Sequence, residues 1–142
     1  MDLISKFTKE ITLVNLAFKQ FLQSKLREHN IDLTFEMMQI LYCLWNKDGI
    51  NQQEIANITA KDKASVTYVL DNLVKRNLVY RQEGADRRNK IIFLTPEGKT
   101  MKKKVQPWIK SLNNTAKNNV PLEKLEELIG VMSTIRENLS EA

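Results

Sequence analysis

The sequence predicts a mainly α-helical fold with one small β-hairpin. Only 4 glycines and 3 prolines occur in 142 residues, so few positions interrupt helices. Apolar residues recur at helical spacing through most of the chain. Residues 78–94 differ, because they contain two short runs rich in β-branched and aromatic side chains.

The two ends of the chain predict long amphipathic helices. The first runs from Leu3 to Leu26, and its apolar seam consists of Phe7, Ile11, Val14, Phe18 and Phe21. The second follows Pro121, and its seam consists of Leu125, Leu128, Met132, Ile135 and Leu139. Alternating spacings of three and four residues are typical of a coiled-coil seam, which needs a partner surface. The two ends are expected either to pack on each other within one helical bundle or to pair with a second copy of the chain. The residues alone slightly favour the bundle.

Three further helices are predicted between the ends. Thr34 caps a helix through Trp45 that is apolar nearly all round and is therefore expected to be buried, and Asp48-Gly49 ends it. The run Asn51-Gln52-Gln53-Glu54 is a capping-box pattern that opens a short helix.

Asp62 caps the third of these helices, which ends near Asn77. Its expected buried side consists of Val66, Val69, Leu70, Leu73 and Val74. The opposite side and its flanks are polar and carry Lys61, Lys63, Ser65, Thr67, Tyr68, Asn72 and Lys75. This helix therefore has one face for a core and another for a ligand.

The runs 78–83 and 90–94 predict the two strands of a hairpin, with Arg87 and Arg88 at its tip. Thr95 and Pro96 then supply an N-cap and a first-turn proline for a long helix. Pro107 lies well inside that helix and is expected to kink or divide it, because proline lacks the backbone N–H.

The formal net charge of +5 is unevenly distributed. Residues 60–110 carry 13 basic and 5 acidic side chains, net +8, whereas residues 1–59 are net -1 and residues 111–142 are net -2. A basic middle third is typical of a localised site for a polyanion. On charge alone, an ordinary solvated surface is an equally good explanation.

Several functional classes find no support in the sequence. No apolar run reaches the roughly 18 to 20 residues of a membrane span, and the first residues do not resemble a signal peptide, so a cytoplasmic protein is expected. Without a Gly-rich phosphate loop, a metal-ligand spacing or a nucleophile beside a base, neither an enzyme nor a bound cofactor or metal is expected. Cys43, the single cysteine, suggests redox sensing as an alternative function, although its apolar neighbours favour a buried structural thiol.

A helix, a short helix, a longer helix and then a hairpin is the element order of a winged helix-turn-helix. In that fold the longer helix enters the DNA major groove and the hairpin lies along the backbone or minor groove. The first backbone amides of the short helix, at Asn51 and Gln52, suit a phosphate. Arginines at the hairpin tip suit a narrow minor groove.

The sequence resembles the MarR family of bacterial transcription regulators. The resemblance is carried by Glu54-Ile55-Ala56, by Asp62 to Thr67, by Asp71 to Val79 and, most strongly, by Asp86-Arg87-Arg88 followed by residues 91–98. It implies a winged helix-turn-helix DNA-binding lobe at 33–104 and a helical dimerisation lobe from 1–32 and 105–142, within one domain spanning 1–142. It favours pairing of the chain ends with a second copy.

The resemblance also implies a function. The expected protein is a homodimeric repressor that binds a pseudo-palindromic operator in double-stranded DNA and is released by a small phenolic or other lipophilic ligand. Asp86 and Arg88 match the wing pair in which the carboxylate orients the chain and the arginine reaches the minor groove. Lys63, Ser65, Thr67 and Tyr68 match positions that meet bases and phosphates. Tyr68 stands where many members have arginine, so this operator is expected to differ from familiar ones.

Overall fold

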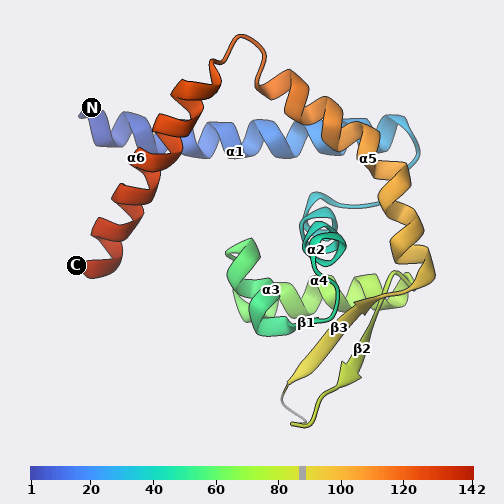
Figure 1. The fold of residues 1–142 in the computed structure, drawn as a ribbon. Coiled ribbons are helices and arrows are strands. Elements are labelled where there is room, and N and C mark those ends of the chain that lie inside the picture. The colour runs from blue at the N-terminus through green and yellow to red at the C-terminus, as the bar shows by residue number, and fades with distance from the viewer. Residues whose placement is uncertain (87–88) are drawn as a thin grey trace. The chain divides into compact units, whose positions relative to one another are not determined.

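The computed structural model describes residues 1–86 and 89–142 and shows a mainly helical chain with one small sheet (Figure 1). The predicted fold class is confirmed. In chain order the elements are α1 (Leu3–Glu28), α2 (Phe35–Asn46), β1 (Ile50–Asn51), α3 (Gln52–Thr59), α4 (Lys63–Lys75), β2 (Val79–Glu83), β3 (Lys90–Leu94), α5 (Pro96–Ala116) and α6 (Leu122–Glu141).

The helices begin at the predicted caps. The Thr34 hydroxyl accepts a hydrogen bond from the Met37 N–H at 3.1 Å, and the Asn51 side chain accepts one from the Glu54 N–H at 2.8 Å. The Thr95 hydroxyl likewise accepts from the Gly98 N–H at 3.0 Å in the first turn of α5. These bonds satisfy N–H groups that the helix itself leaves without partners, so the cap residues set where each helix starts.

The sheet has one strand more than the predicted hairpin. Its order is β1-β3-β2 and all neighbours are antiparallel, with Ile50 opposite Ile92 and Val79 opposite Leu94. Sequence patterning missed β1 because two residues are too few to show an alternation. This strand connects the end of α2 to the start of α3 and so fixes α3 beside the sheet.

Two sequence predictions about the helices need correction. Tyr42 was expected to be buried with the rest of α2, but 50% of it is exposed, and Val74 is exposed at the end of α4. The remaining apolar residues of α2 and α4 already fill the core side of each helix. Of the two effects predicted for Pro107, a kink or a division, the division does not occur, because α5 continues through Pro107 as one helix. Among the described residues, no helix is both long and apolar enough to cross a bilayer.

The chain forms two compact units, residues 1–109 and residues 110–142. The core of the first unit lies among α1, α2, α3, α4, the sheet and the first part of α5. Its fully buried side chains are Leu26, Ile40, Leu41, Leu44, Ile55, Val66, Leu70, Leu73, Val79, Ile92 and Val105. In the second unit, α6 has no buried residue.

A compact junction joins the end of α4 to the start of α5. The buried Thr95 hydroxyl donates to the Asn77 carbonyl at 2.6 Å, and the Thr95 N–H donates to the Leu78 carbonyl at 3.1 Å. The Trp45 indole N–H of α2 donates to the Gly98 carbonyl at 2.9 Å. These hydrogen bonds hold α2, the end of α4 and the start of α5 together around Gly98, with Leu78 just before β2.

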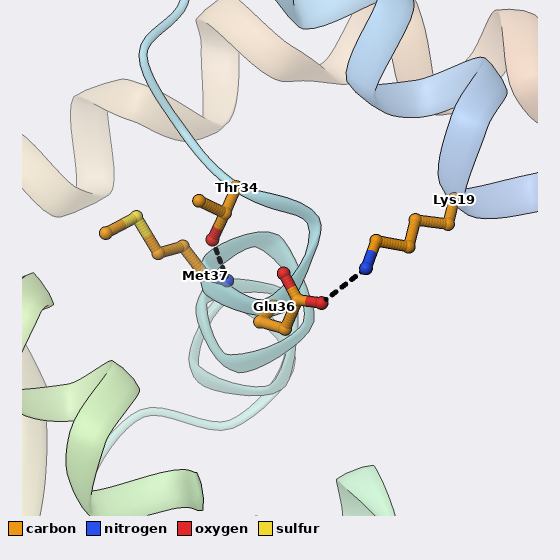
Figure 2. Close-up of polar contacts among 4 residues, drawn as sticks. All are labelled: Lys19, Thr34, Glu36 and Met37. Atoms are coloured by element: carbon orange, nitrogen blue, oxygen red, sulfur yellow. Dashed lines mark hydrogen bonds and ion pairs between the residues drawn. The ribbon is translucent and has the colours of Figure 1, made fainter.

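An ion pair ties α1 to the start of α2 (Figure 2). The Lys19 Nζ lies 2.9 Å from the Glu36 Oε1, beside the Thr34 cap. Burial raises the pKa of the Glu36 carboxyl, but the hydrogen bond and charge of Lys19, with the charge of Lys61, outweigh burial and hold that pKa below its ordinary value. The ion pair between Lys19 and Glu36 is therefore strongest when Glu36 is ionised.

Replacing Glu36 by glutamine is expected to lower the free energy of unfolding at pH 7 by at most about 1 kcal/mol, because an ion pair this exposed is screened by solvent. A lowered carboxyl pKa contributes stability above the ordinary glutamate range, and that contribution is lost as pH falls through the lowered value. Urea denaturation at pH 7 and at about pH 3 should show the difference shrinking at the acid pH.

Glu127→Gln is the control for this experiment. The Glu127 Oε2 lies 3.8 Å from the Lys124 Nζ, and both side chains are more exposed than those of Lys19 and Glu36. A smaller effect is expected at both pH values. An equal loss for Glu36→Gln at neutral and acid pH would show that the ion pair is not its cause.

Candidate nucleic-acid interface

The start of α4 is built by a carboxylate cap. The Asp62 Oδ1 accepts from the Ser65 N–H at 2.7 Å, and the Ser65 hydroxyl donates to the Asp62 Oδ2 at 3.0 Å. These two hydrogen bonds from Ser65 lower the pKa of the Asp62 carboxyl. Ser65, predicted as a DNA contact, therefore uses its hydroxyl proton inside the cap.

α4 separates an apolar face from an exposed polar one. Val66, Val69, Leu70 and Leu73 are buried, as predicted, because they follow the helical period. Lys63, Tyr68 and Lys75 are exposed, and Tyr68 is 70% exposed. Thr67 and Asn72 are half-buried at the edges. An exposed aromatic ring on a helix whose other face is fully packed is available to a partner.

The N-terminus of α3 is locked to α4. The Gln52 Nε2 donates to the Thr67 Oγ1 at 2.8 Å, and the Thr67 hydroxyl donates to the Lys63 carbonyl at 2.9 Å. The Asn51 side chain caps α3 by accepting from the Glu54 N–H. The side chains of Gln52 and Thr67 thus link the two helices, and the side chain of Asn51 caps α3.

The turn between α3 and α4 places a lysine near α2. Ala60 adopts a left-handed conformation with φ of 53°, and the Lys61 N–H donates to the Ala56 carbonyl at 3.1 Å. Lys61 is half-buried, and its charge helps to lower the pKa of the Glu36 carboxyl. The Lys61 side chain therefore interacts electrostatically with Glu36 of α2.

The wing, the hairpin of β2 and β3, projects past α3 and α4 (Figure 1). The Arg81 Nη2 lies 2.7 Å from the Asp71 Oδ1 and so braces β2 against α4. At the turn, the Asp86 carbonyl accepts from the Asn89 N–H at 2.9 Å. The predicted contacts Arg87 and Arg88 lie outside the described residues.

Sequence reasoning missed the Asp71–Arg81 pair and the neighbouring Lys90. Asp71 and Arg81 are ten positions apart, on a helix and a strand separated by a turn, and no spacing rule connects such residues. The available signal was charge inside the predicted strands, where Arg81 follows Val79 and Tyr80, and Lys90 precedes the apolar run 91–94.

Cys43 is a buried free cysteine of α2. Burial raises the pKa of its thiol, so the reactive thiolate is disfavoured. This confirms the structural interpretation, and nothing in the site supports the redox alternative. Among the described residues, no group of three or more His, Cys, Asp or Glu side chains is placed to hold a metal ion.

Comparison with known proteins identifies the family. The MarR family model matches residues 33–90. The transcriptional regulator HosA of Escherichia coli O157:H7 is 33% identical over 95 residues, which cover 62% of this chain and 70% of HosA. The chain belongs to the MarR family. MarR proteins are transcription regulators and not enzymes, so this chain is a transcriptional regulator.

Solved MarR-type structures share the whole fold. The MarR family regulator NMB1585 from Neisseria meningitidis matches with a TM-score of 0.83 at 20% identity, covering 99% of this chain and 96% of that one. MepR of S. aureus, solved as a complex with DNA, matches with a TM-score of 0.81 at 24% identity, covering 93% and 97%. At such identities these likenesses establish the fold of this MarR chain.

Proposed function

We propose that this MarR-family regulator is a cytoplasmic homodimer that binds a pseudo-palindromic operator in double-stranded DNA and represses transcription. The observation that carries the proposal is the exposed polar face of α4, on which Tyr68 is 70% exposed, beside a projecting wing in the segment of net charge +8. Such a helix fits a major groove, and the positive charge matches the phosphate backbone. MepR, which has this fold, has been solved with DNA bound.

The proposed contacts divide by chemistry. Tyr68 and Asn72 are assigned to base edges, and Lys61, Lys63 and Lys75 to phosphates. Arg87 and Arg88 are assigned to the minor groove, with Asp86 orienting the wing. The remaining contacts are assigned to the backbone amides and side chains at the helix starts, namely Asn51, Gln52, Ser65 and Thr67. All four side chains already support the helices: Gln52 and Thr67 link α3 to α4, Asn51 caps α3, and Ser65 donates to the Asp62 cap of α4, so their removal would also loosen the site.

The homodimer is supported by apolar surface that the single chain leaves exposed. On α1 only Leu22 and Leu26 are buried, whereas Val14 of the predicted seam is exposed. On α6, Leu125, Leu128 and Leu139 of the second seam are exposed. Residues 110–142 are too few to form a stable core alone, because chains below about 40 residues bury too little surface. A second copy of the same seams supplies the missing partner.

Release by a small phenolic or lipophilic ligand completes the proposal. It is supported by the resemblance to regulators of this family, and the ligand's contact residues are not assigned. Selecting bound fragments from the source genome, with and without candidate phenolic ligands, would identify the operator and test the response to ligand in one experiment.

Tyr68→Ala is expected to weaken binding to the selected operator by about tenfold, because one base contact contributes about 1–3 kcal/mol of discrimination. Fluorescence anisotropy with labelled operator and with a mixed-sequence duplex should show the larger loss on the operator. Binding of the unaltered chain should also fall steeply as salt increases.

Tyr42→Ala is the matched control, since Tyr42 is also an exposed tyrosine but lies on α2. It is expected to leave both affinities unchanged. The proposal is wrong if duplex binding is independent of salt, or if Arg88→Ala and Tyr68→Ala both bind the operator as tightly as the unaltered chain.

A further inference from the structure

The first half of α5 carries a row of lysines on its solvent side. Lys99, Lys102 and Lys103 are all exposed, whereas Gly98 and Val105 of the same helix are buried against the core. Positions three and four residues apart lie on one face of an α-helix, so these three ammonium groups form a single lysine stripe. The stripe therefore faces solvent and takes no part in packing the core.

No carboxylate balances the charge of the lysine stripe. Among the described residues, no ion pair involves Lys99, Lys102 or Lys103. Glu97 is the one acidic residue of α5, and it lies seven positions before Lys104, on the same face as that lysine and away from the stripe. Like charges three or four residues apart destabilise a helix. A bound polyanion would remove this repulsion.

The lysine stripe starts at the base of the wing (Figure 1). Only Thr95 separates β3 from α5, and its N–H donates to the Leu78 carbonyl just before β2. Gly98 packs so closely on Leu78 that no side chain fits between them. Lys99 follows Gly98 directly, and the wing and the stripe belong to the same compact unit, residues 1–109. Packing therefore fixes the position of the stripe relative to the wing.

Duplex DNA is the polyanion that this position favours. A duplex held by the wing keeps its flanking phosphates close to α5, so a second contact is intramolecular and benefits from a high effective concentration. An acidic protein or a lipid surface would have to be recruited separately. Flanking DNA must bend to reach α5, and counterions released at the lysines offset the cost of that bend.

We propose that the lysine stripe binds the sugar-phosphate backbone of DNA that flanks the operator, beyond the segment contacted by α4 and the wing. Lys99 and Lys103 lie about 6 Å apart along the helix axis, which matches about two phosphates of one strand. Contacts of this kind carry no base information, so the flanking sequence is not specified. The proposal rests on the proposed binding of duplex DNA.

The test compares two labelled duplexes that contain the selected operator. The core duplex has about 24 base pairs, enough for two half-sites one helical turn apart, and the extended duplex adds about 15 base pairs of mixed sequence at each end. Each phosphate contact contributes about 0.9 to the slope of log affinity against log salt concentration. With two stripes in the proposed homodimer, the unaltered chain is expected to show a slope about 3–4 larger on the extended duplex than on the core duplex.

The stripe variant combines Lys99→Gln, Lys102→Gln and Lys103→Gln. It is expected to lose the additional slope on the extended duplex and to bind the core duplex as the unaltered chain does. Fluorescence resonance energy transfer between dyes at the two ends of the extended duplex supplies a second readout. Transfer should increase when the unaltered chain binds, because the flanks bend toward α5, and it should increase less with the stripe variant.

A control variant combines Lys9→Gln, Lys104→Gln and Lys117→Gln. These three lysines are exposed, form no ion pair with another described residue and lie outside the stripe, so the control removes the same total charge. It should keep the additional slope and the energy transfer of the unaltered chain. Circular dichroism checks that both variants remain folded.

The outcomes separate the two proposals. If the unaltered chain binds both duplexes with equal slopes, or if the stripe and control variants behave alike, the stripe proposal is overturned and operator binding stands. An equal loss of affinity on both duplexes for the stripe variant would also overturn it. If the stripe variant keeps the additional slope but loses binding to phosphatidylserine vesicles, a lipid surface is the partner instead of DNA. If the unaltered chain binds neither duplex, the proposed function and the stripe proposal both fail.

Discussion

Replacing Gly98 by alanine is expected to destabilise the protein by about 3 kcal/mol or more, a large part of the roughly 5–15 kcal/mol that a domain of this size has. A Cβ atom at this position would lie 2.1 Å from the Leu78 carbonyl oxygen and 3.2 Å from the Leu94 Cδ2. The first of these atoms is backbone, which cannot move aside as the end of a flexible side chain can. Relief requires α5 to move away from the end of α4.

That movement would disturb contacts made by three elements. The Gly98 carbonyl accepts from the Trp45 indole, and the Gly98 N–H donates to the Thr95 hydroxyl. Buried groups that lose their partners add their own desolvation cost. Differential scanning calorimetry of Gly98→Ala should show a melting temperature lowered by about 10 °C, at roughly 3–4 °C for each kcal/mol in a chain of this size.

Gly130→Ala provides the control, because a Cβ at Gly130 meets no atom within 4 Å. Gly130 lies inside α6, where alanine is favoured over glycine by about 1 kcal/mol, so this variant should be no less stable than the unaltered chain. A Gly98→Ala variant that melts with the unaltered chain would contradict the close packing of α5 on Leu78.

Leu128→Glu is expected to convert the proposed homodimer into a monomer and to weaken operator binding by about 100-fold or more. Leu128 lies in the α6 seam and is 46% exposed in the single chain. In a dimer it would be covered by apolar side chains, and an unpaired carboxylate there would cost several kcal/mol. Two linked lobes bind two half-sites far more tightly than separate lobes do, because the second contact is intramolecular.

Sedimentation velocity and fluorescence anisotropy on the selected operator measure the two effects together. Thr134→Glu is the control, since it adds the same charge to an exposed position of α6 outside the seam. It should remain dimeric and bind normally. A dimeric Leu128→Glu variant would exclude this seam from the interface, whereas a monomeric variant with undiminished operator affinity would separate DNA binding from dimerisation.

Most of the fold could be predicted because its signals are local. Thr34, Asn51, Asp62 and Thr95 each stand directly before a helix, and a cap bond reaches only three residues along the chain. The buried face of α4 follows from helical spacing within 13 residues. The strand β1 was not predicted, because its two residues are too few to show the alternation of buried and exposed side chains that identifies a strand.

The candidate site could be predicted in part. Lys63 and Tyr68 are exposed on α4 as expected, because their positions follow from the same periodicity that buries Val66. The supporting roles of Gln52 and Thr67 were not visible, since the two residues lie 15 positions apart and meet only when α3 packs on α4. The exposure of Tyr42 also depended on packing, because neighbouring elements cover only part of α2.

The sequence by itself determined the element order, the helix caps, the basic segment and the membership of the MarR family, because each depends on residue types at short, fixed spacings. Only the tertiary structure decided that Asp71 pairs with Arg81 and that Gly98 has no room for a side chain. These features depend on distances between elements that are separated along the chain. Such distances are set by how the whole core packs, and no local pattern of residues records them.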